Sequence, residues 1–220
     1  EMNDVEWQAR VDTAALYRLI ALEGWDDLVG THVSSRIPGD EHHFLLNPYG
    51  MLFEEITASS LLTVDLDGNQ LTHSNYNFNQ AGFTIHSAVH MNRDDAMFVI
   101  HLHSDYGVAV SCQEDGLKPL NQTAIAVYSD LAYHDYEGVA TNLAERERIV
   151  EDLGAKNAMI LRNHGTMACG PNAGGAWQAI YRLERACKYQ ILAESGGATT
   201  RSLLADIVDS RAGTTSTEAL

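Results

Sequence analysis

The sequence predicts a single α/β domain over residues 1–220, with strands in the middle of the chain and helices before, between and after them. Two segments, 5–25 and 172–197, repeat apolar residues at the spacing of a helix. Between them, short apolar runs are separated by Gly, Pro, Asn and Asp, which is typical of strands and turns. A chain of 220 residues also lies within the size that one hydrophobic core commonly serves.

The N-terminal part is predicted to form a helix followed by two strands. Segment 5–25 has an apolar face and stops at Gly24, as an amphipathic helix does. Segment 31–39 alternates apolar and polar residues, which predicts a strand. Segment 42–57 predicts a second strand, and the Asn-Pro-Tyr-Gly turn signal at residues 47–50 ends it.

The middle of the chain is predicted to contain a hairpin, a helix and a strand. Segment 61–71 reverses at the Asp-Gly pair 67–68, which is typical of a hairpin. Segment 81–92 has an apolar face at helical spacing, and segment 96–104 is an apolar run that predicts a strand. For segment 107–116 the pattern fits a short helix or a strand equally well.

The C-terminal part is predicted to add two strands and a long helix. Segment 157–170 is a strand, a loop and a strand, and segment 172–197 is a helix closed by its final Gly-Gly pair. Segment 199–220 has a short apolar patch and a polar end that we expect to fray after about residue 210. The chain has no repeat, low-complexity tract or linker that would divide it into two domains.

Composition narrows the class of protein. The formal net charge is −16, and such a surface repels phosphate backbones and anionic lipids, so neither nucleic acid nor a membrane is an expected partner. The three cysteines, Cys112, Cys169 and Cys187, form no CxxC pair, which favours a reducing compartment over a disulfide framework. No apolar run approaches the roughly 18 residues of a membrane span, and no signal-peptide pattern opens the sequence. We therefore expect a cytoplasmic protein.

Three histidines at strand ends predict a metal site. His101 and His103 are two residues apart in a strand, so both side chains point to the same face. Two buried imidazoles need partners, and a divalent ion supplies one to both; on this pair alone, ordinary core packing is still slightly favoured. His164 follows another apolar strand and precedes Gly165, which allows a close backbone approach or a positive φ. Three histidines on two strand ends resemble an open catalytic site more than a closed structural one.

A second histidine pair, His86 and His90, lies on one face of the helix predicted at 81–92. The zinc-protease motif HExxH is absent because Ser87 follows His86. The usual arrangement of such a pair is one histidine packed against the sheet and one exposed. We expect His90 to be the exposed one.

Four ordered motifs reveal a resemblance that runs from about Val11 to Gly197. The runs "NPYGMLFEEITASSLLTVDLDGN", "NQAGFTIHSAVH…VIHLHS", "YHDYEGVAT" and "ILRNHGTMACG" resemble the class II aldolase/adducin family, and most of all its adducin-head-like bacterial branch. This resemblance implies a three-layer α/β/α fold with a central, mostly antiparallel sheet. It also implies a homotetramer with active sites near subunit interfaces.

The resemblance implies that the same three histidines are metal ligands. The ligands of the family's sugar-phosphate aldolases fall on His101, His103 and His164. In those enzymes the metal acts as a Lewis acid on the oxygen atoms of the substrate. The implied cofactor is a divalent ion, with zinc as the first choice and iron or manganese as alternatives.

The chain departs from the aldolase pattern at several positions. The aldolases carry a glutamate, which serves as base and extra ligand, where this chain has Gly82. Around the substrate site the matching positions are His32, Tyr49, Gly50 and Gln80, and we expect these four to bind substrate. A phosphate cradle needs small residues and free N–H groups, whereas His32 and Tyr49 make the site narrower and more aromatic. A simple sugar-phosphate aldolase is therefore not the expected function.

The favoured function is a metal-dependent lyase for a small, non-phosphorylated hydroxy-carboxylate or carbonyl substrate. Decarboxylation removes no carbon-bound proton, so the chain could perform it without a carboxylate at Gly82. Tyr49 and Phe53 would line an aromatic pocket or, equally well, pack in the core. His134 and Tyr49 are the catalytic candidates; Asp135 is an alternative base for an aldol-type cleavage, although the loop around it fits an ordered interface better.

Two other functions remain open. An Fe(II)-dependent oxygenase could use three imidazoles with open coordination positions, although the usual carboxylate ligand is missing. A non-enzymatic scaffold is the third alternative, because adducins keep the same histidine motifs. The sequence lacks the basic tail that adducins use, which places the scaffold last.

Overall fold

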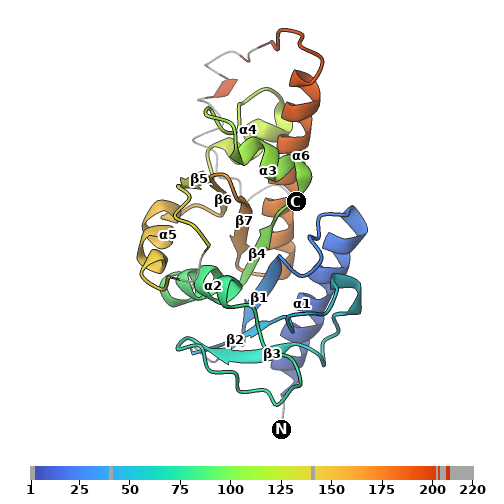
Figure 1. The fold of residues 1–220 in the computed structure, drawn as a ribbon, viewed down its shortest axis with the longest axis vertical. Helices are drawn as coiled ribbons and strands as arrows, with labels where there is room; N and C mark the ends of the chain where they lie inside the picture. Colours follow the sequence, from blue (N-terminus) through green and yellow to red (C-terminus); the bar gives the residue numbers. More distant parts are fainter. Residues whose placement is uncertain (1–2, 40–41, 140–141, 202, 204–206, 209–220) are drawn as a thin grey trace.

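The computed structural model describes residues 3–39, 42–139, 142–201, 203 and 207–208. The predicted fraying after about residue 210 lies outside these residues. Figure 1 shows a central sheet with helices on both faces, which confirms the three-layer α/β/α fold.

One seven-stranded sheet forms the middle layer in the described part of the chain, in the order β3-β2-β1-β4-β7-β6-β5. Every neighbouring pair is antiparallel except β5 and β6. The sheet is therefore mostly antiparallel, as expected. The strands are β1 (His32–Arg36), β2 (His43–Leu46), β3 (Leu62–Asp65), β4 (Phe98–Leu102), β5 (Leu131–His134), β6 (Ala158–Leu161) and β7 (Gly165–Gly170).

The helices divide between the two faces of the sheet. Helices α2 and α5 pack together on one face, while α1, α3, α4 and α6 cover the other (Figure 1). The bounds are α1 (Asp4–Glu23), α2 (Gln80–Asn92), α3 (Asp105–Ser111), α4 (Gln122–Tyr128), α5 (Glu145–Leu153) and α6 (Ala173–Glu194), with a 3₁₀ turn η1 (Phe53–Glu55). Gly24 caps α1 in the left-handed conformation, as the sequence predicts.

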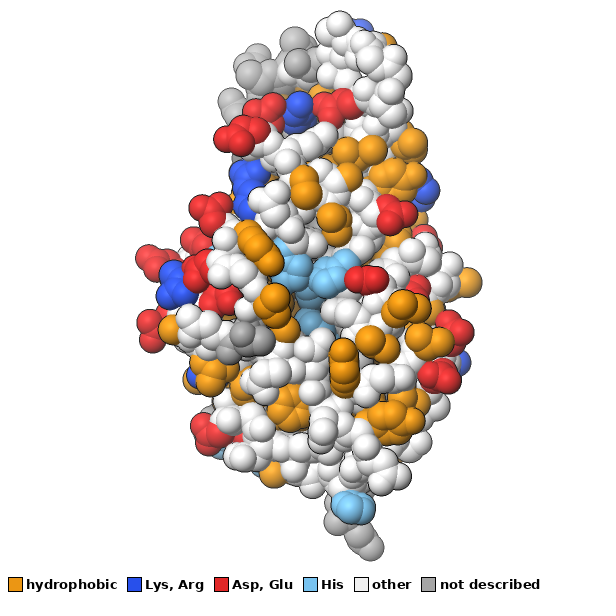
Figure 2. Space-filling model, viewed as in Figure 1, with side chains coloured by type: hydrophobic (Ala, Val, Ile, Leu, Met, Phe, Trp, Pro, Cys, Tyr) orange, Lys and Arg blue, Asp and Glu red, His pale blue; other side chains and the backbone are white. Residues whose placement is uncertain are grey.

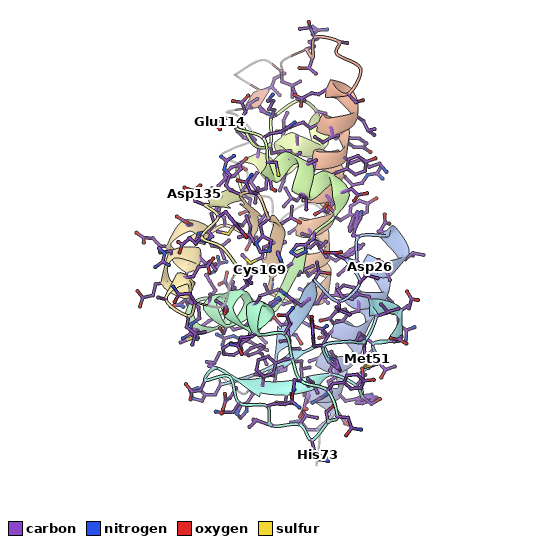
Figure 3. All side chains as sticks on the ribbon, in the orientation of Figure 1. Asp26, Met51, His73, Glu114, Asp135 and Cys169 are labelled. Carbon is purple, nitrogen blue, oxygen red and sulfur yellow. The ribbon has the colours of Figure 1, made fainter. Side chains whose placement is uncertain are left out.

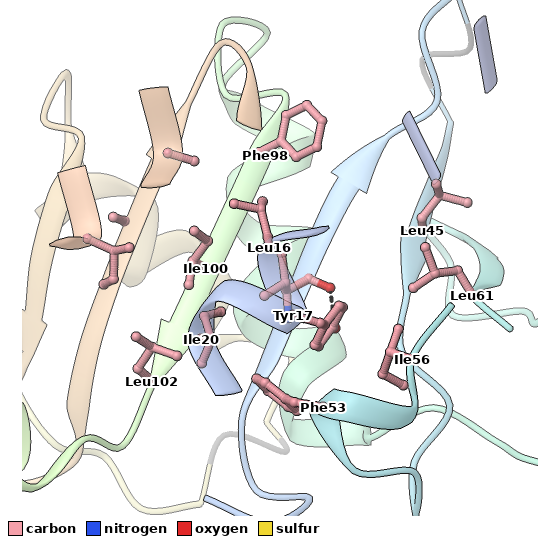
Figure 4. Close-up of a cluster of buried hydrophobic side chains, with 14 of the residues drawn as sticks. Leu16, Tyr17, Ile20, Leu45, Phe53, Ile56, Leu61, Phe98, Ile100 and Leu102 are labelled. Atoms are coloured by element: carbon pink, nitrogen blue, oxygen red, sulfur yellow. Dashed lines mark hydrogen bonds between the residues drawn. The ribbon is translucent and has the colours of Figure 1, made fainter. Parts of the chain in front are cut away.

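Helix α1 is fixed to the sheet by a buried tyrosine. The Tyr17 hydroxyl donates to the carbonyl of Val33 at 2.6 Å and accepts the Val33 N–H at 2.7 Å. Its ring meets Phe53 edge-on, with the centroids 4.6 Å apart (Figure 4). Phe53 is thus part of the hydrophobic core. Of the two placements that the sequence leaves open, an aromatic pocket or the core, the structure shows the core.

Side chains along β4 point alternately to the two faces of the sheet, which places His101 on the face opposite Ile100 and Leu102. Ile100 and Leu102 belong to the core beneath α1 and α6, whereas Val99 packs toward α2 and α5. His101 therefore faces the α2 side, next to His32 of the paired strand β1.

Several local predictions can be compared with the structure. Segment 107–116, which fitted helix or strand, begins as helix α3. The hairpin predicted at 61–71 turns at Gly68, but its returning side makes only an isolated bridge from Gln70 to Val64. Helices α4 and α5 and strand β5 occur where no element was predicted. Among the residues that the structure describes, no helix is long and apolar enough to span a bilayer.

Candidate metal centre

Three imidazole rings meet where two central strands of the sheet, β4 and β7, end and begin, respectively. His101 lies in β4, His103 one residue beyond its end, and His164 directly before β7. The three ring centroids are 4.7 to 4.9 Å apart, and one ligand nitrogen from each ring lies within 4.8 Å of the others. Figure 2 shows histidines gathered in a hollow near the middle of this face. The structure thus brings together all three predicted ligands.

The outer nitrogens of two rings are held by acceptors. His101 Nδ1 lies 3.0 Å from the carbonyl oxygen of Thr166, and His103 Nδ1 lies 3.0 Å from Oδ2 of Asp27. Neither oxygen can donate a hydrogen bond, so each Nδ1 carries the proton. In the neutral tautomer of each ring, Nε2 is then bare. Outer acceptors of this kind orient metal-binding histidines in many proteins.

The two bare nitrogens face each other. His101 Nε2 and His103 Nε2 are 3.0 Å apart, so their lone pairs repel unless a cation lies between them. Two nitrogens bound to one tetrahedral zinc ion, each at about 2.0–2.1 Å, stand about 3.3 Å apart. A proton bridges only two rings, whereas a metal ion also accepts His164. These residues therefore fit a divalent ion with an open coordination position.

A close backbone approach places His164. A Cβ at Gly165 would lie 2.2 Å from the carbonyl oxygen of Leu102, so only glycine allows β7 to start this near the end of β4. The prediction of a close approach at Gly165 is confirmed. The positive φ, 56°, belongs instead to Asn163, and this less common conformation aims the next residue into the site.

Burial favours the neutral form of two of the rings, His101 and His164, and metal binding requires neutral imidazoles. Burial lowers the pKa of His101 well below its usual value, and the neighbouring imidazoles lower it further. Burial, with smaller contributions from His103 and His134, lowers the pKa of His164 to about 4.

A cavity of about 360 Å³ opens beside the three rings. His32 is buried in its wall, 5.0 Å from the His101 ring, centroid to centroid. The other described lining residues are Gly30, Asn79, Ala81, Ile85, Tyr136, Gly138, Val139 and Asn163. The predicted substrate-binding residue His32 thus lines the same cavity as the three predicted metal ligands.

A chain of hydrogen bonds continues from His32 into α2. His32 Nδ1 lies 2.7 Å from His86 Nε2, His86 Nδ1 pairs with the Ser34 hydroxyl, and that hydroxyl lies 2.7 Å from His90 Nε2. All four side chains are buried. The prediction that His90 is exposed is wrong: its relative exposure is 1%, because α2 is covered by the sheet and by α5.

The catalytic candidate His134 lies in a neighbouring space at the end of β5. Its Nδ1 is 2.7 Å from Oδ2 of Asp152, while its Nε2 has no hydrogen-bond partner in the described structure and lies 3.5 Å from a carboxylate oxygen of Glu145. It lines a small cavity of about 10 Å³ that shares His164 and Tyr136 with the larger one. His134 is therefore close to the metal centre but separated from it by His164.

The remaining predicted site residues do not line the cavity. Tyr49 is 49% exposed in the turn after β2, and Gly50 follows with a φ of 106° beside the ring of Tyr76. Gln80 is exposed at the first residue of α2. Asp135 is exposed at the edge of the molecule (Figure 3). His73, for which no role is predicted, is exposed in the loop after β3, away from the cavity (Figure 3). Substrate binding by Tyr49, Gly50 and Gln80 stays a prediction.

Two comparisons identify the family. The model of the "Class II Aldolase and Adducin N-terminal domain" matches residues 11–191. A Caulobacter vibrioides protein, whose name provisionally assigns it to aldolase class 2, is 61% identical over 197 residues; the match covers 90% of this chain and 77% of the relative. This chain belongs to the class II aldolase and adducin family. The resemblance inferred from the motifs is confirmed.

Family members with other names share the domain. Mouse alpha-adducin is 41% identical over 200 residues, which cover 89% of this chain but 27% of the adducin. An aldolase II superfamily protein from Pseudomonas syringae superimposes with a TM-score of 0.92 and 46% identity, over 96% of this chain and 86% of that one. L-fuculose 1-phosphate aldolase from Glaciozyma antarctica gives 0.84 and 29%, over 96% and 84%. The fold prediction is confirmed, and the family includes both a named aldolase and adducins.

Proposed function

We propose that this protein is a metal-dependent carbon–carbon lyase that decarboxylates or cleaves a small, non-phosphorylated hydroxy-carboxylate or carbonyl compound. The observation that carries the proposal is the 3.0 Å separation of the two bare nitrogens of His101 and His103, with His164 beside them. When bound by these three rings, a divalent ion supplies Lewis-acid polarisation of the substrate's oxygen atoms. Zinc is the ion proposed first, because three imidazoles and an open position suit it; iron and manganese are the alternatives.

The cavity wall favours a substrate without phosphate. No Lys or Arg occurs among the described residues that line it. At the N-terminus of α2, the Asn79 side chain already accepts the N–H groups of Ala81 and Gly82, at 3.0 and 3.5 Å. These two amides are therefore not free to bind an anion, and the described lining residues offer phosphate no cationic side chain.

The absence of a carboxylate from the described cavity wall favours bond cleavage that needs no strong base. Gly82 cannot abstract a proton, and the space beside it is filled by His32. In a decarboxylation the breaking C–C bond supplies the electron pair, so this chain's task is to bind and orient the substrate and to exclude water. Ala81, Ile85 and Val139 provide the apolar part of that wall.

Proton delivery is assigned to His134. Its Nδ1–H donates to Asp152, which leaves Nε2 as the nitrogen that accepts and returns a proton. The small cavity that His134 lines shares His164 and Tyr136 with the larger one, which supports a role for His134 beside the substrate site. Tyr49 remains a second catalytic candidate, although it is not among the described residues that line the cavity.

A metal-replete activity screen tests the function. Hydroxy-carboxylates, aromatic ones included, would be assayed for CO₂ release and aldehyde formation, with wild type and His103→Ala in parallel. We expect turnover by wild type, about one divalent ion per chain by elemental analysis, and loss of both in the variant. His73→Ala, in an exposed loop, is the matched control. Equal metal content in wild type and His103→Ala would contradict the proposal.

The 41% identity to alpha-adducin supports a second candidate, a non-enzymatic scaffold. That function predicts a metal site without turnover on any compound in the screen. An oxygenase would instead contain iron and consume oxygen; no carboxylate joins the histidine cluster in the described structure, which makes this the weakest of the three.

We further propose that the protein forms a homotetramer in the cytoplasm. Tyr136 and Val139 are 54% and 71% exposed at the cavity, and such apolar side chains at a site entrance suit a contact with another subunit. Light scattering of the purified protein and cell fractionation would test assembly and location. A monomer at micromolar concentration would contradict the tetramer.

A further inference from the structure

A buried carboxylate on α6 joins the two strand ends that carry the metal ligands. Glu184 is 2% exposed. One of its carboxylate oxygens accepts the Ser104 hydroxyl, and the other accepts the Thr166 hydroxyl. In the described structure this carboxylate has no Lys or Arg partner. The hydrogen bonds from the two hydroxyl groups therefore compensate the cost of removing it from water.

Each hydroxyl belongs to a segment that positions a ligand. Ser104 directly follows His103, which lies beyond the last residue of β4 and so lacks a strand partner to fix it. Thr166 is two residues after His164, and its carbonyl oxygen accepts the Nδ1–H of His101 at 3.0 Å. Through Ser104, Glu184 therefore holds the residue next to His103. Through Thr166, it holds the residue whose carbonyl oxygen accepts the Nδ1–H of His101.

The residues around the carboxylate fix the direction of the Ser104 hydrogen bond and leave space for the Glu184 side chain. Ser104 Oγ accepts the N–H of Gly107 at 3.0 Å, so its own proton is directed to Glu184. A Cβ at Gly107 would lie 2.7 Å from Ser104 Oγ and 3.0 Å from a Glu184 oxygen. Glycine at this position thus leaves the space that the carboxylate occupies.

We infer that Glu184 is a positioning residue for the metal centre: it sets the spacing between the end of β4 and the start of β7 at which the three imidazoles converge. The inference rests on the proposed function, because it concerns the same site. It assigns to Glu184 a geometric task and no contact with substrate or metal. A side chain that held the two hydroxyls without a charge would therefore perform the same task.

Metal affinity and the absorption spectrum of bound Co(II) test this role. Each protein would be titrated with Co(II) and Zn(II) in competition with a chromophoric chelator. Glu184→Ala is expected to bind about 10- to 100-fold more weakly and to shift the Co(II) bands, since losing a group that orients ligands typically has that effect. Glu184→Gln, which can still bond both hydroxyls, is expected to restore most of the affinity.

Gln190→Ala is the matched control. Gln190 lies on the same helix, is fully buried, and also ties down a loop, through the N–H of Lys118 at 2.7 Å and the carbonyl of Gly116 at 2.8 Å. None of its hydrogen bonds in the described structure reaches Ser104, Thr166 or the three histidines. Its loss is expected to lower the unfolding temperature but to leave the Co(II) spectrum and affinity as in wild type.

The outcomes separate this inference from the proposed function. If wild type binds no metal, both are overturned. If wild type binds metal and Glu184→Ala binds it with the same affinity and spectrum, this inference alone is overturned. Thr166→Val keeps the size of the side chain and removes one of the two hydroxyls, so it serves if Glu184→Ala does not fold, and the same loss of affinity and shifted spectrum are expected.

Discussion

The imidazole of His32 covers the α-carbon of Gly82 so closely that a Cβ at position 82 would lie 2.6 Å from His32 Cδ2 and 2.8 Å from Nε2. His32 comes from β1 and Gly82 from the first turn of α2, and both are buried. The histidine therefore occupies the volume that any side chain at position 82 would need. A glutamate at position 82 would therefore require the His32 ring to move.

This coupling predicts a cost for the smallest possible side chain at position 82. Gly82→Ala forces the His32 ring to move, and overpacking of a buried site costs about 1–3 kcal/mol of unfolding free energy. Urea denaturation would measure it. In the double variant with His32→Ala the penalty of the alanine should largely disappear, and simple additivity of the two changes would contradict the coupling.

Gly174→Ala is the control for that measurement. Gly174 also lies in the first turn of a helix, α6, and a Cβ there would have as its nearest neighbour a side-chain oxygen of Asn172 at 3.4 Å. Alanine should be neutral or stabilising at this position, because it has the higher helix propensity.

The outer acceptor of His103 gives a second prediction. Asp27→Asn replaces a carboxylate that only accepts with an amide that can also donate, so the tautomer of His103 is no longer fixed. We expect metal affinity to fall about 10- to 100-fold, measured by competition with a chelator. Asp26→Asn, which removes the same charge from the adjacent residue, should leave the affinity within about twofold by the same principle. Equal effects of the two variants would show that only net charge matters.

The sequence was sufficient to predict that His101, His103 and His164 converge, but not which residues hold them in place. His101, His103 and His164 were predictable because strand alternation and a glycine after a strand end are local signals. Asp27 and Glu184 are single carboxylates in a chain with 30 Asp and Glu, and nothing in their neighbours along the sequence distinguishes them. Their roles depend on which distant strand end each one meets.

The missed elements and the wrong burial have related causes. Helix α5 is only nine residues long and mostly charged, so its apolar face is limited to Ile149, Val150 and Leu153. Strand β5 has only four residues, too few to show a clear alternation. Helix α2 is buried on every side from Gly82 to His90, so a polar side chain there does not indicate a solvent-facing position. His90 was misplaced for this reason.

Burial of His90 predicts acid-sensitive stability. Burial, with Arg36 nearby, lowers the pKa of His90 to about 3, while the unfolded chain has a histidine pKa of about 6.5. Below pH 6.5 the unfolded state therefore binds a proton that the folded state does not. Stability is lost as the pH falls from about 6.5 to about 3, with a slope of about 1.4 kcal/mol per pH unit for this residue, and burial of His32 and His86 acts in the same direction.

The slope can be assigned with one substitution. In His90→Gln the unfolding free energy, measured by urea denaturation between pH 4 and pH 6.5, should depend on pH less steeply by about one proton. His73→Gln, in the exposed loop after β3, should retain the wild-type slope. A wild-type slope in His90→Gln would mean that His90 is not the group whose protonation destabilises the fold.

The cavity wall also predicts which ligands the protein rejects. Dihydroxyacetone phosphate carries a dianionic group. The described cavity wall offers it no Lys and no Arg, and the N–H groups of Ala81 and Gly82 at the start of α2 are already bonded to Asn79. The overall charge of −16 opposes its approach as well. Calorimetry on the metal-loaded protein should therefore detect no binding of dihydroxyacetone phosphate in the micromolar range. A hydroxy-carboxylate of similar size should bind more tightly. Its adjacent oxygens can reach the three-histidine centre, and it has no phosphate group to accommodate. Micromolar binding of dihydroxyacetone phosphate would mean that groups outside the described cavity wall complete a phosphate site, and the protein would then be better explained as a sugar-phosphate aldolase.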